Sequence, residues 1–265
     1  MSNVFETKGI ILRRKALGEE DVLVTFLSPS LGLKKAIAPG AKKHKSPLRG
    51  KTELLLENNF LLIRGRSLDK IKEIETEQYY PRLRENIGKL AASQYLAEVV
   101  LHLALSGQSQ EELYNLFRAH LRRLGDLKPQ DWLFPHIAQA IYHLLALSGI
   151  APQVYNCVFS QRPITPNFDK PGWRVGFSFA GGGISECFRQ ESSYALVEEE
   201  LNALELALLQ ALPQPFLPAG FLHCDDLLLR RSWQKIENLL KNYLQWYLGF
   251  KIRSAEVLAD ILMEF

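Results

Sequence analysis

The spacing of apolar residues changes once along this chain, at Tyr79-Tyr80-Pro81. Before this point, short apolar runs of strand length are separated by Gly and Pro. After it, apolar residues recur at helical spacing. Side chains repeat about every 2 residues in a strand and about every 3.6 in a helix, so one segment cannot satisfy both patterns. The change therefore predicts two portions of different architecture that meet near residues 79–83.

The first portion predicts five short strands. They are Gly9–Arg13, Asp21–Ser28, Leu33–Ala38, Glu53–Ile63 and Lys70–Thr76. Short strands separated by Gly and Pro turns at close intervals suit a small closed barrel. We therefore expect residues 1–80 to form a five-stranded barrel domain.

The second portion predicts a helical domain over residues 81–265. Helices are expected over about 90–103, 113–121 and 137–147, and again over Tyr194–Leu212, Asp225–Leu248 and Ser254–Met263. Gly149 is placed to end the third of them. An insert at 151–190 is rich in Pro and Gly, and within it Trp173–Phe179 alternates as a strand. The fold class is thus α+β.

Basic residues are concentrated in one segment. The chain has 32 Lys+Arg and 29 Asp+Glu, a net charge of +3. No acidic residue lies between Val22 and Thr52, a stretch that contains seven basic residues. The rest of the chain therefore has 25 basic and 29 acidic residues, a net charge of −4. The seven are Lys34, Lys35, Lys42, Lys43, Lys45, Arg49 and Lys51.

The run Lys42-Lys43-His44-Lys45 lies between Pro39-Gly40 and Pro47, which predicts a loop. Neighbouring cations repel one another unless anions lie between them. One interpretation is a solvated charged loop. The other is a phosphate contact, since Lys and Arg release condensed counterions when they neutralise phosphates. Small barrels bind single strands along basic grooves, which favours the second interpretation, although the charge specifies no base.

Motifs for catalysis or nucleotide binding are incomplete. Gly50-Lys51-Thr52 ends like a phosphate-binding loop, but Lys45 stands where that motif needs Gly, and a strand is expected to follow. Gly181-Gly182-Gly183 lacks dinucleotide-loop spacing and predicts a tight turn. We expect no catalytic residue. The aromatic residues of the last long helix favour core over base stacking; they are Trp233, Tyr243, Trp246 and Tyr247.

The three cysteines indicate a reducing compartment, because they are sparse and odd in number. The N-terminus has no signal-peptide apolar run, and no window approaches the roughly 20 apolar residues that span a bilayer. We expect a cytoplasmic protein with no membrane segment. A structural zinc site uses paired Cys-x-x-Cys, whereas Ser160 occupies the partner position of Cys157, and Cys187 also lacks a partner. We expect no metal in the insert.

Several runs of residues resemble the opening of bacterial RecO DNA repair proteins. They are Lys8-Gly9-Ile10-Ile11-Leu12, then Gly18-Glu19-Glu20-Asp21 with Thr25-Phe26, and Gly40-Ala41-Lys42-Lys43-His44-Lys45-Ser46. Leu244–Ser254 is similar to the C-terminal segment of that family. Many members carry four cysteines that bind zinc in the insert. Only Cys157 and Cys187 remain here, as a degenerate zinc-knuckle region.

The resemblance implies an N-terminal OB-fold and a non-enzymatic recombination mediator in the cytoplasm, associated with the nucleoid. Such a protein binds single- and double-stranded DNA and anneals complementary strands. It also implies RecR as a partner, indirect assistance to RecA, and binding of the acidic tail of the single-stranded-DNA-binding protein by the helical half. The same seven basic residues would face DNA.

Two other classes of function stay open. A metal-dependent nucleic-acid-processing enzyme would need a carboxylate cluster or an intact phosphate loop. A protein adaptor with no direct DNA role would use the basic loop to meet an acidic partner.

Overall fold

The computed structural model describes residues 3–128, 131–186, 197–222 and 227–264. The chain packs into two compact units, one of Met1–Asp126 with Arg253–Phe265 and the other of Leu127–Ile252. The first unit therefore contains helices as well as the barrel. The expected domain boundary at residue 80 stays a prediction.

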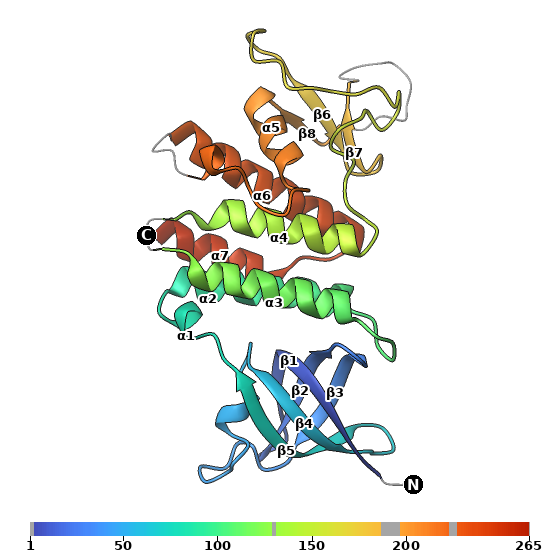
Figure 1. The fold of residues 1–265 in the computed structure, drawn as a ribbon, viewed down its shortest axis with the longest axis vertical. Helices are drawn as coiled ribbons and strands as arrows, with labels where there is room; N and C mark the ends of the chain where they lie inside the picture. The colour runs from blue at the N-terminus through green and yellow to red at the C-terminus, as the bar shows by residue number, and fades with distance from the viewer. Residues whose placement is uncertain (1–2, 129–130, 187–196, 223–226, 265) are drawn as a thin grey trace. The chain divides into compact units, whose positions relative to one another are not determined.

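The barrel is built from five strands, as the sequence predicts. They are β1 (Val4–Leu17), β2 (Asp21–Ser28), β3 (Gly32–Ala38), β4 (Glu57–Ile63) and β5 (Asp69–Gln78). The strands close in the order β1-β2-β3-β5-β4 (Figure 1). All neighbours are antiparallel except β3 and β5, which pair in parallel. The long strand β1 closes the barrel because it pairs with both β2 and β4.

The barrel core follows from the alternation of β2. Val22, Val24 and Phe26 lie on one face of that strand and are buried in the core. Phe26 stacks on Phe60 of β4, with ring centroids 4.3 Å apart. A Cβ atom on Gly9 of β1 would lie 2.4 Å from Phe26 Cδ2, so the core needs glycine there.

The predicted strand Glu53–Ile63 is wrong at its start, because β4 begins at Glu57. Leu55 has a φ of +66°, which interrupts an extended chain. Its N–H donates to Ile11 O (2.9 Å), and the N–H of Ile11 donates to Leu56 O (3.0 Å). The segment before β4 is thus a turn held against β1.

The helices of the first unit are α1 (Pro81–Arg84), α2 (Ile87–Leu103), α3 (Glu111–Asp126) and α7 (Arg253–Glu264). Asn86 caps α2 by accepting a bond from Lys89 N. Glu98 of α2 caps α7, because its carboxylate accepts the backbone N–H groups of Arg253 (3.3 Å) and Ser254 (2.8 Å). The predicted final helix is confirmed, and it packs on α2.

The second unit contains α4 (Leu133–Leu147), α5 (Ala203–Ala211) and α6 (Leu227–Leu248), with α4 packed on α6. A small sheet has the order β7-β6-β8, from β6 (Val175–Ser178), β7 (Gly183–Ser185) and β8 (Glu199–Leu201). Gly149 has a φ of +76° just after α4, as expected of a helix end. Gly181 and Gly182 lie in the turn between β6 and β7, and Gly183 begins β7, which confirms the predicted tight turn.

The predicted helix Tyr194–Leu212 is wrong in its first half. Residues 194–196 lie outside the described part of the chain, and Glu199–Leu201 form β8, which pairs with β6. The helix starts after Asn202, whose side chain accepts from Glu205 N while Glu205 accepts from Asn202 N. This capping box gives the helix a start that apolar spacing alone did not show.

Candidate nucleic-acid interface

The basic segment divides between a strand and a loop. Lys34 and Lys35 belong to β3, whereas the other five predicted residues lie in the basic loop, residues 39–51, which follows β3. The loop is fixed against the β1–β2 hairpin. Gly40 N–H donates to Asp21 Oδ1 (2.8 Å), and Lys42 N–H donates to Glu20 O (2.9 Å).

Three lysines of the basic loop contact other parts of the barrel. Lys42 Nζ donates to Gly18 O (3.1 Å), and Lys51 Nζ donates to Ile74 O (2.7 Å). Lys43 Nζ lies 2.7 Å from Glu20 Oε2, and this hydrogen bond and charge raise the pKa of Lys43. Both side chains of that pair are exposed, so it adds little stability and can exchange for a phosphate contact.

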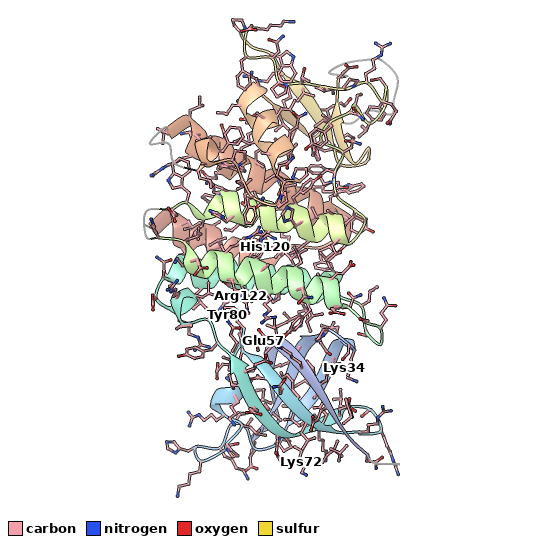
Figure 2. All side chains as sticks on the ribbon, in the orientation of Figure 1. Lys34, Glu57, Lys72, Tyr80, His120 and Arg122 are labelled. Atoms are coloured by element: carbon pink, nitrogen blue, oxygen red, sulfur yellow. The ribbon has the colours of Figure 1, made fainter. Side chains whose placement is uncertain are left out.

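Lys35, Lys45 and Arg49 are exposed, and among the described residues their side chains make no hydrogen bond or ion pair. Lys34 differs, because its Nζ lies 2.8 Å from Asp69 Oδ2 and 5.9 Å from the centre of the Phe5 ring. Figure 2 shows Lys34 on the other side of the barrel from the light-blue basic loop. The seven predicted residues therefore do not form one continuous patch.

A second set of basic residues, missed at the sequence level, lies on β1. Arg13 and Lys15 are exposed on β1, and Arg14 Nη1 forms an ion pair with Glu53 (3.2 Å). Arg13 and Lys35 both pair with Thr25 of β2, so the three lie side by side across three strands. The consecutive run Arg13-Arg14-Lys15 was the signal that could have found them.

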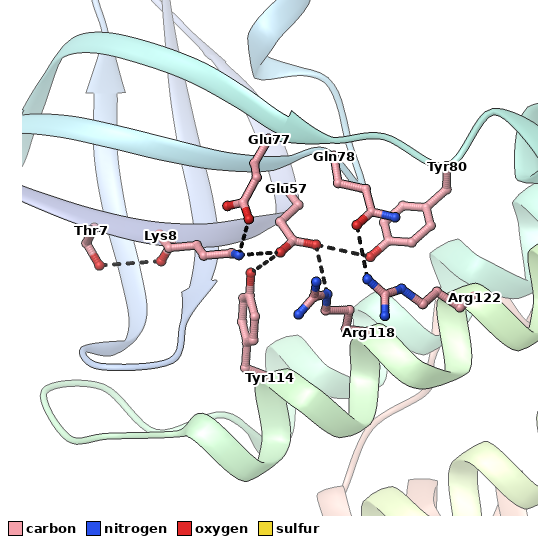
Figure 3. Close-up of polar contacts among 9 residues, drawn as sticks. All are labelled: Thr7, Lys8, Glu57, Glu77, Gln78, Tyr80, Tyr114, Arg118 and Arg122. Atoms are coloured by element: carbon pink, nitrogen blue, oxygen red, sulfur yellow. Dashed lines mark hydrogen bonds and ion pairs between the residues drawn. The ribbon is translucent and has the colours of Figure 1, made fainter.

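A buried carboxylate, Glu57, joins the barrel to α3 (Figure 3). Lys8 Nζ of β1 lies 2.9 Å from Glu57 Oε1 and 2.6 Å from Glu77. Arg118 Nε of α3 lies 3.3 Å from Glu57 Oε2. The hydroxyls of Tyr114 (2.8 Å) and Tyr80 (3.3 Å) donate to the same carboxylate. We call these six residues the Glu57 cluster.

The environment of Glu57 favours its ionised form. Burial raises the pKa of the carboxyl, but the hydrogen bonds from Lys8 and Tyr114 and the charges of Lys8 and Arg118 outweigh burial, so the pKa is lowered. Burial and the Glu57 charge raise the pKa values of Tyr80 and Tyr114, which keeps both hydroxyls protonated as donors. The cluster therefore fixes the helices on the barrel end.

Over its described residues, 151–186, the insert presents no donor set that fits zinc. Cys157 is fully buried, and its Sγ accepts the N–H of Ser160 (3.4 Å), the residue where a zinc knuckle would place its second thiolate. Cys187 lies outside the described residues, as do His223 and Cys224. Within the described ranges, no three His, Cys, Asp or Glu side chains gather as metal ligands.

The remaining motifs take ordinary structural positions. Gly50–Thr52 form a short 3-10 turn ahead of β4, not the strand–loop–helix of a phosphate loop. On α6, Trp233 and Tyr243 are buried, whereas Trp246 and Tyr247 are 51% and 53% exposed. The expectation that most of these aromatics are core thus holds for two of the four. No helix in the described part of the chain is long and apolar enough to cross a membrane.

Comparisons with known proteins cover nearly the whole chain. Residues 1–80 match the family model described as Recombination protein O N terminal, and residues 84–256 match Recombination protein O C terminal. The chain is 46% identical over 279 residues to the DNA repair protein RecO of Gloeothece citriformis, covering 99% of this chain and 98% of that protein. It is 44% identical over 269 residues to the protein of the same name from Synechocystis sp., covering 100% and 99%.

Proposed function

The chain belongs to the RecO family of DNA repair proteins, and from this premise we propose that it is a non-enzymatic recombination mediator that binds DNA through its barrel. The observation that carries the proposal is the basic loop with its exposed, unpaired cations. Lys45 and Arg49 meet no carboxylate among the described residues, so they are free to neutralise phosphates.

Electrostatic binding also accounts for annealing. Two single strands repel each other through their phosphates, and cations on the barrel screen this repulsion without any covalent step. The mediator accepts single- and double-stranded DNA because the loop contacts backbone, which both share. RecR, the acidic tail of the single-stranded-DNA-binding protein and, indirectly, RecA are the proposed partners, and the cytoplasm is the proposed compartment.

The test compares two double variants that change charge equally. Lys45→Glu with Arg49→Glu alters the basic loop, and Lys170→Glu with Arg174→Glu alters exposed residues of the insert. Anisotropy of a labelled single strand is measured at several salt concentrations. The loop variant should bind more weakly, and its log–log salt slope should fall by roughly 0.7 for each lost contact. The insert variant should match the wild type.

Two results would count against the proposal. Unchanged affinity and salt slope in the loop variant would remove the loop from the interface. Cleavage of the oligonucleotide that needs magnesium and stops with EDTA would instead indicate a nuclease. Annealing of complementary strands coated with the single-stranded-DNA-binding protein, with RecR added, tests the mediator role itself.

A further inference from the structure

A hollow of about 510 Å³ lies in the first unit, where the end of β5, the 3-10 turn and α1 come together. Its lining includes Gly50, Leu56, Thr76, Tyr79, Pro81 and Arg84. This volume lies within the range of small-molecule sites in proteins. One side chain of the lining, Tyr79, is unusually exposed for an aromatic residue of this unit.

Tyr79 is 60% exposed, and among the described residues of the first unit no other aromatic side chain is as open to solvent. The neighbouring residue differs. Tyr80 is buried, and its hydroxyl donates to Glu57 (3.3 Å), whereas the side chain of Tyr79 before it is exposed. The chain thus anchors Tyr80 in the Glu57 cluster and leaves Tyr79 in the lining of the hollow.

The chain around Tyr79 is stiff. Pro81 fixes its own φ and narrows the backbone choices of Tyr80, the residue that follows Tyr79. Tyr80 itself donates to a carboxylate that three other side chains also contact. An aromatic ring presented on such a segment loses little conformational freedom when a ligand stacks on it.

One basic residue lies in the lining of the hollow, and two more are sequence neighbours of a lining residue. Gly50 is flanked by Arg49 and Lys51 of the basic loop, and Arg84 lines the hollow directly. Arg49 and Arg84 are exposed and make no ion pair within the described ranges. Glu85 is the one acidic side chain of the lining. The hollow thus continues the basic loop with an aromatic surface, which matches a base attached to phosphates.

We propose that this hollow takes one unpaired base of a single DNA strand, stacked on Tyr79, while Arg49 and Arg84 meet the adjoining phosphates. The inference rests on the proposed DNA binding and adds a stacking site to it. Bases in a duplex are stacked on each other and cannot enter, so Tyr79 makes binding favour single strands over duplex.

The test uses the full chain with a thymine oligonucleotide, the matching duplex, and an abasic oligonucleotide of equal length. Tyr79→Phe keeps the ring, Tyr79→Leu keeps an apolar side chain without the ring, and Leu105→Ala truncates another exposed apolar residue of the same unit. Tyr79→Leu should weaken binding of the thymine strand by about 5- to 150-fold, which corresponds to the contribution of one stacked base. Tyr79→Phe and Leu105→Ala should bind like the wild type.

Two further readouts separate stacking from charge. Tyr79→Leu should leave the salt slope and the duplex affinity unchanged, and it should bind thymine and abasic strands equally, whereas the wild type should prefer thymine. If Tyr79→Leu binds the thymine strand as the wild type does, the stacking site is wrong while DNA binding stands. If the wild type binds no DNA, both proposals are wrong. They are also wrong if an acidic peptide binds at Tyr79 and no oligonucleotide displaces it.

Discussion

Tyr114 Oη of α3 lies 2.8 Å from Glu57 Oε1 at the start of β4, so a helix donor and a barrel acceptor meet within a buried cluster. Arg118, one turn later on α3, faces the same carboxylate. Helix and barrel are thus joined by charge as well as by apolar packing.

Removing the charge of Glu57 should destabilise the first unit. Glu57→Gln keeps the shape of the side chain but leaves Arg118 without its anion and Lys8 with Glu77 alone, which should cost on the order of 3 kcal/mol in urea unfolding. Glu77→Gln is the matched control, since it contacts the same Lys8 from an exposed position and should cost less than about 1 kcal/mol. Equal losses in the two variants would contradict this assignment.

The same carboxylate makes stability depend on pH. The pKa of Glu57 is lower in the folded protein than its ordinary value of 4.5, so the folded state binds fewer protons than the unfolded state near that pH. Its contribution to stability is complete above pH 4.5 and is lost as the pH falls through the folded pKa. The difference between wild type and Glu57→Gln should therefore shrink below pH 4.5, as urea midpoints across an acid series would show. A constant difference would contradict the pKa shift.

Gly9 should tolerate no side chain. Gly9→Ala places a Cβ 2.4 Å from Phe26 Cδ2 and 2.9 Å from Leu27 O, and we expect a loss of about 1–3 kcal/mol from overpacking. Gly50→Ala is the control, because no atom lies within 4 Å of its Cβ. Thermal unfolding of both variants checks the prediction, and a stable Gly9→Ala would mean that the Phe26–Phe60 stack can shift.

Glu98 should hold the start of α7. Glu98→Ala removes the acceptor of two backbone N–H groups, which should cost about 1–2 kcal/mol and speed hydrogen exchange in Arg253–Glu264. Glu98→Gln retains a carbonyl oxygen and should cost less. Identical exchange in Glu98→Ala and wild type would show that packing on α2 alone fixes the helix.

Purified protein should contain no stoichiometric zinc. The thiol of Cys157 is buried and accepts the N–H of Ser160, the residue that stands where a zinc knuckle would place its second thiolate. Elemental analysis should find well below one zinc per chain, and EDTA should leave the thermal midpoint unchanged. One zinc per chain that EDTA removes with loss of stability would contradict the prediction.

Local patterns predicted the elements of this fold well. A short apolar run that stops at Pro29 indicated the strand β2, and Gly149 marked the end of α4. Local pattern failed where a distant partner decides the structure. Glu199–Leu201 forms a strand because it pairs with β6. The helical spacing of apolar residues near Leu206 gave no sign of this pairing.

The candidate interface was predictable only in part. Lys42, Lys43 and Lys45 are neighbours in sequence, so the loop keeps them together in space. Lys34 lies apart from them, because four residues of extended strand carry it about 13 Å from Ala38, and its contact with DNA stays a prediction. The Glu57 cluster gathers residues from positions 8 to 118 and could not be read from spacing, since only the closed barrel and α3 bring them together.

The capping of α7 by Glu98 has a consequence for synthesis of the protein. The unit that holds the barrel also needs Arg253–Glu264, while residues 127–252 form the other unit. During translation, the ribosome releases the barrel strands first but supplies their last helix only after the whole second unit has emerged. The unit that begins first is therefore completed last, and nascent chains spend most of their synthesis with one side of α2 uncovered. Apolar surface exposed on a nascent chain is prone to aggregation until the helix that covers it has been made.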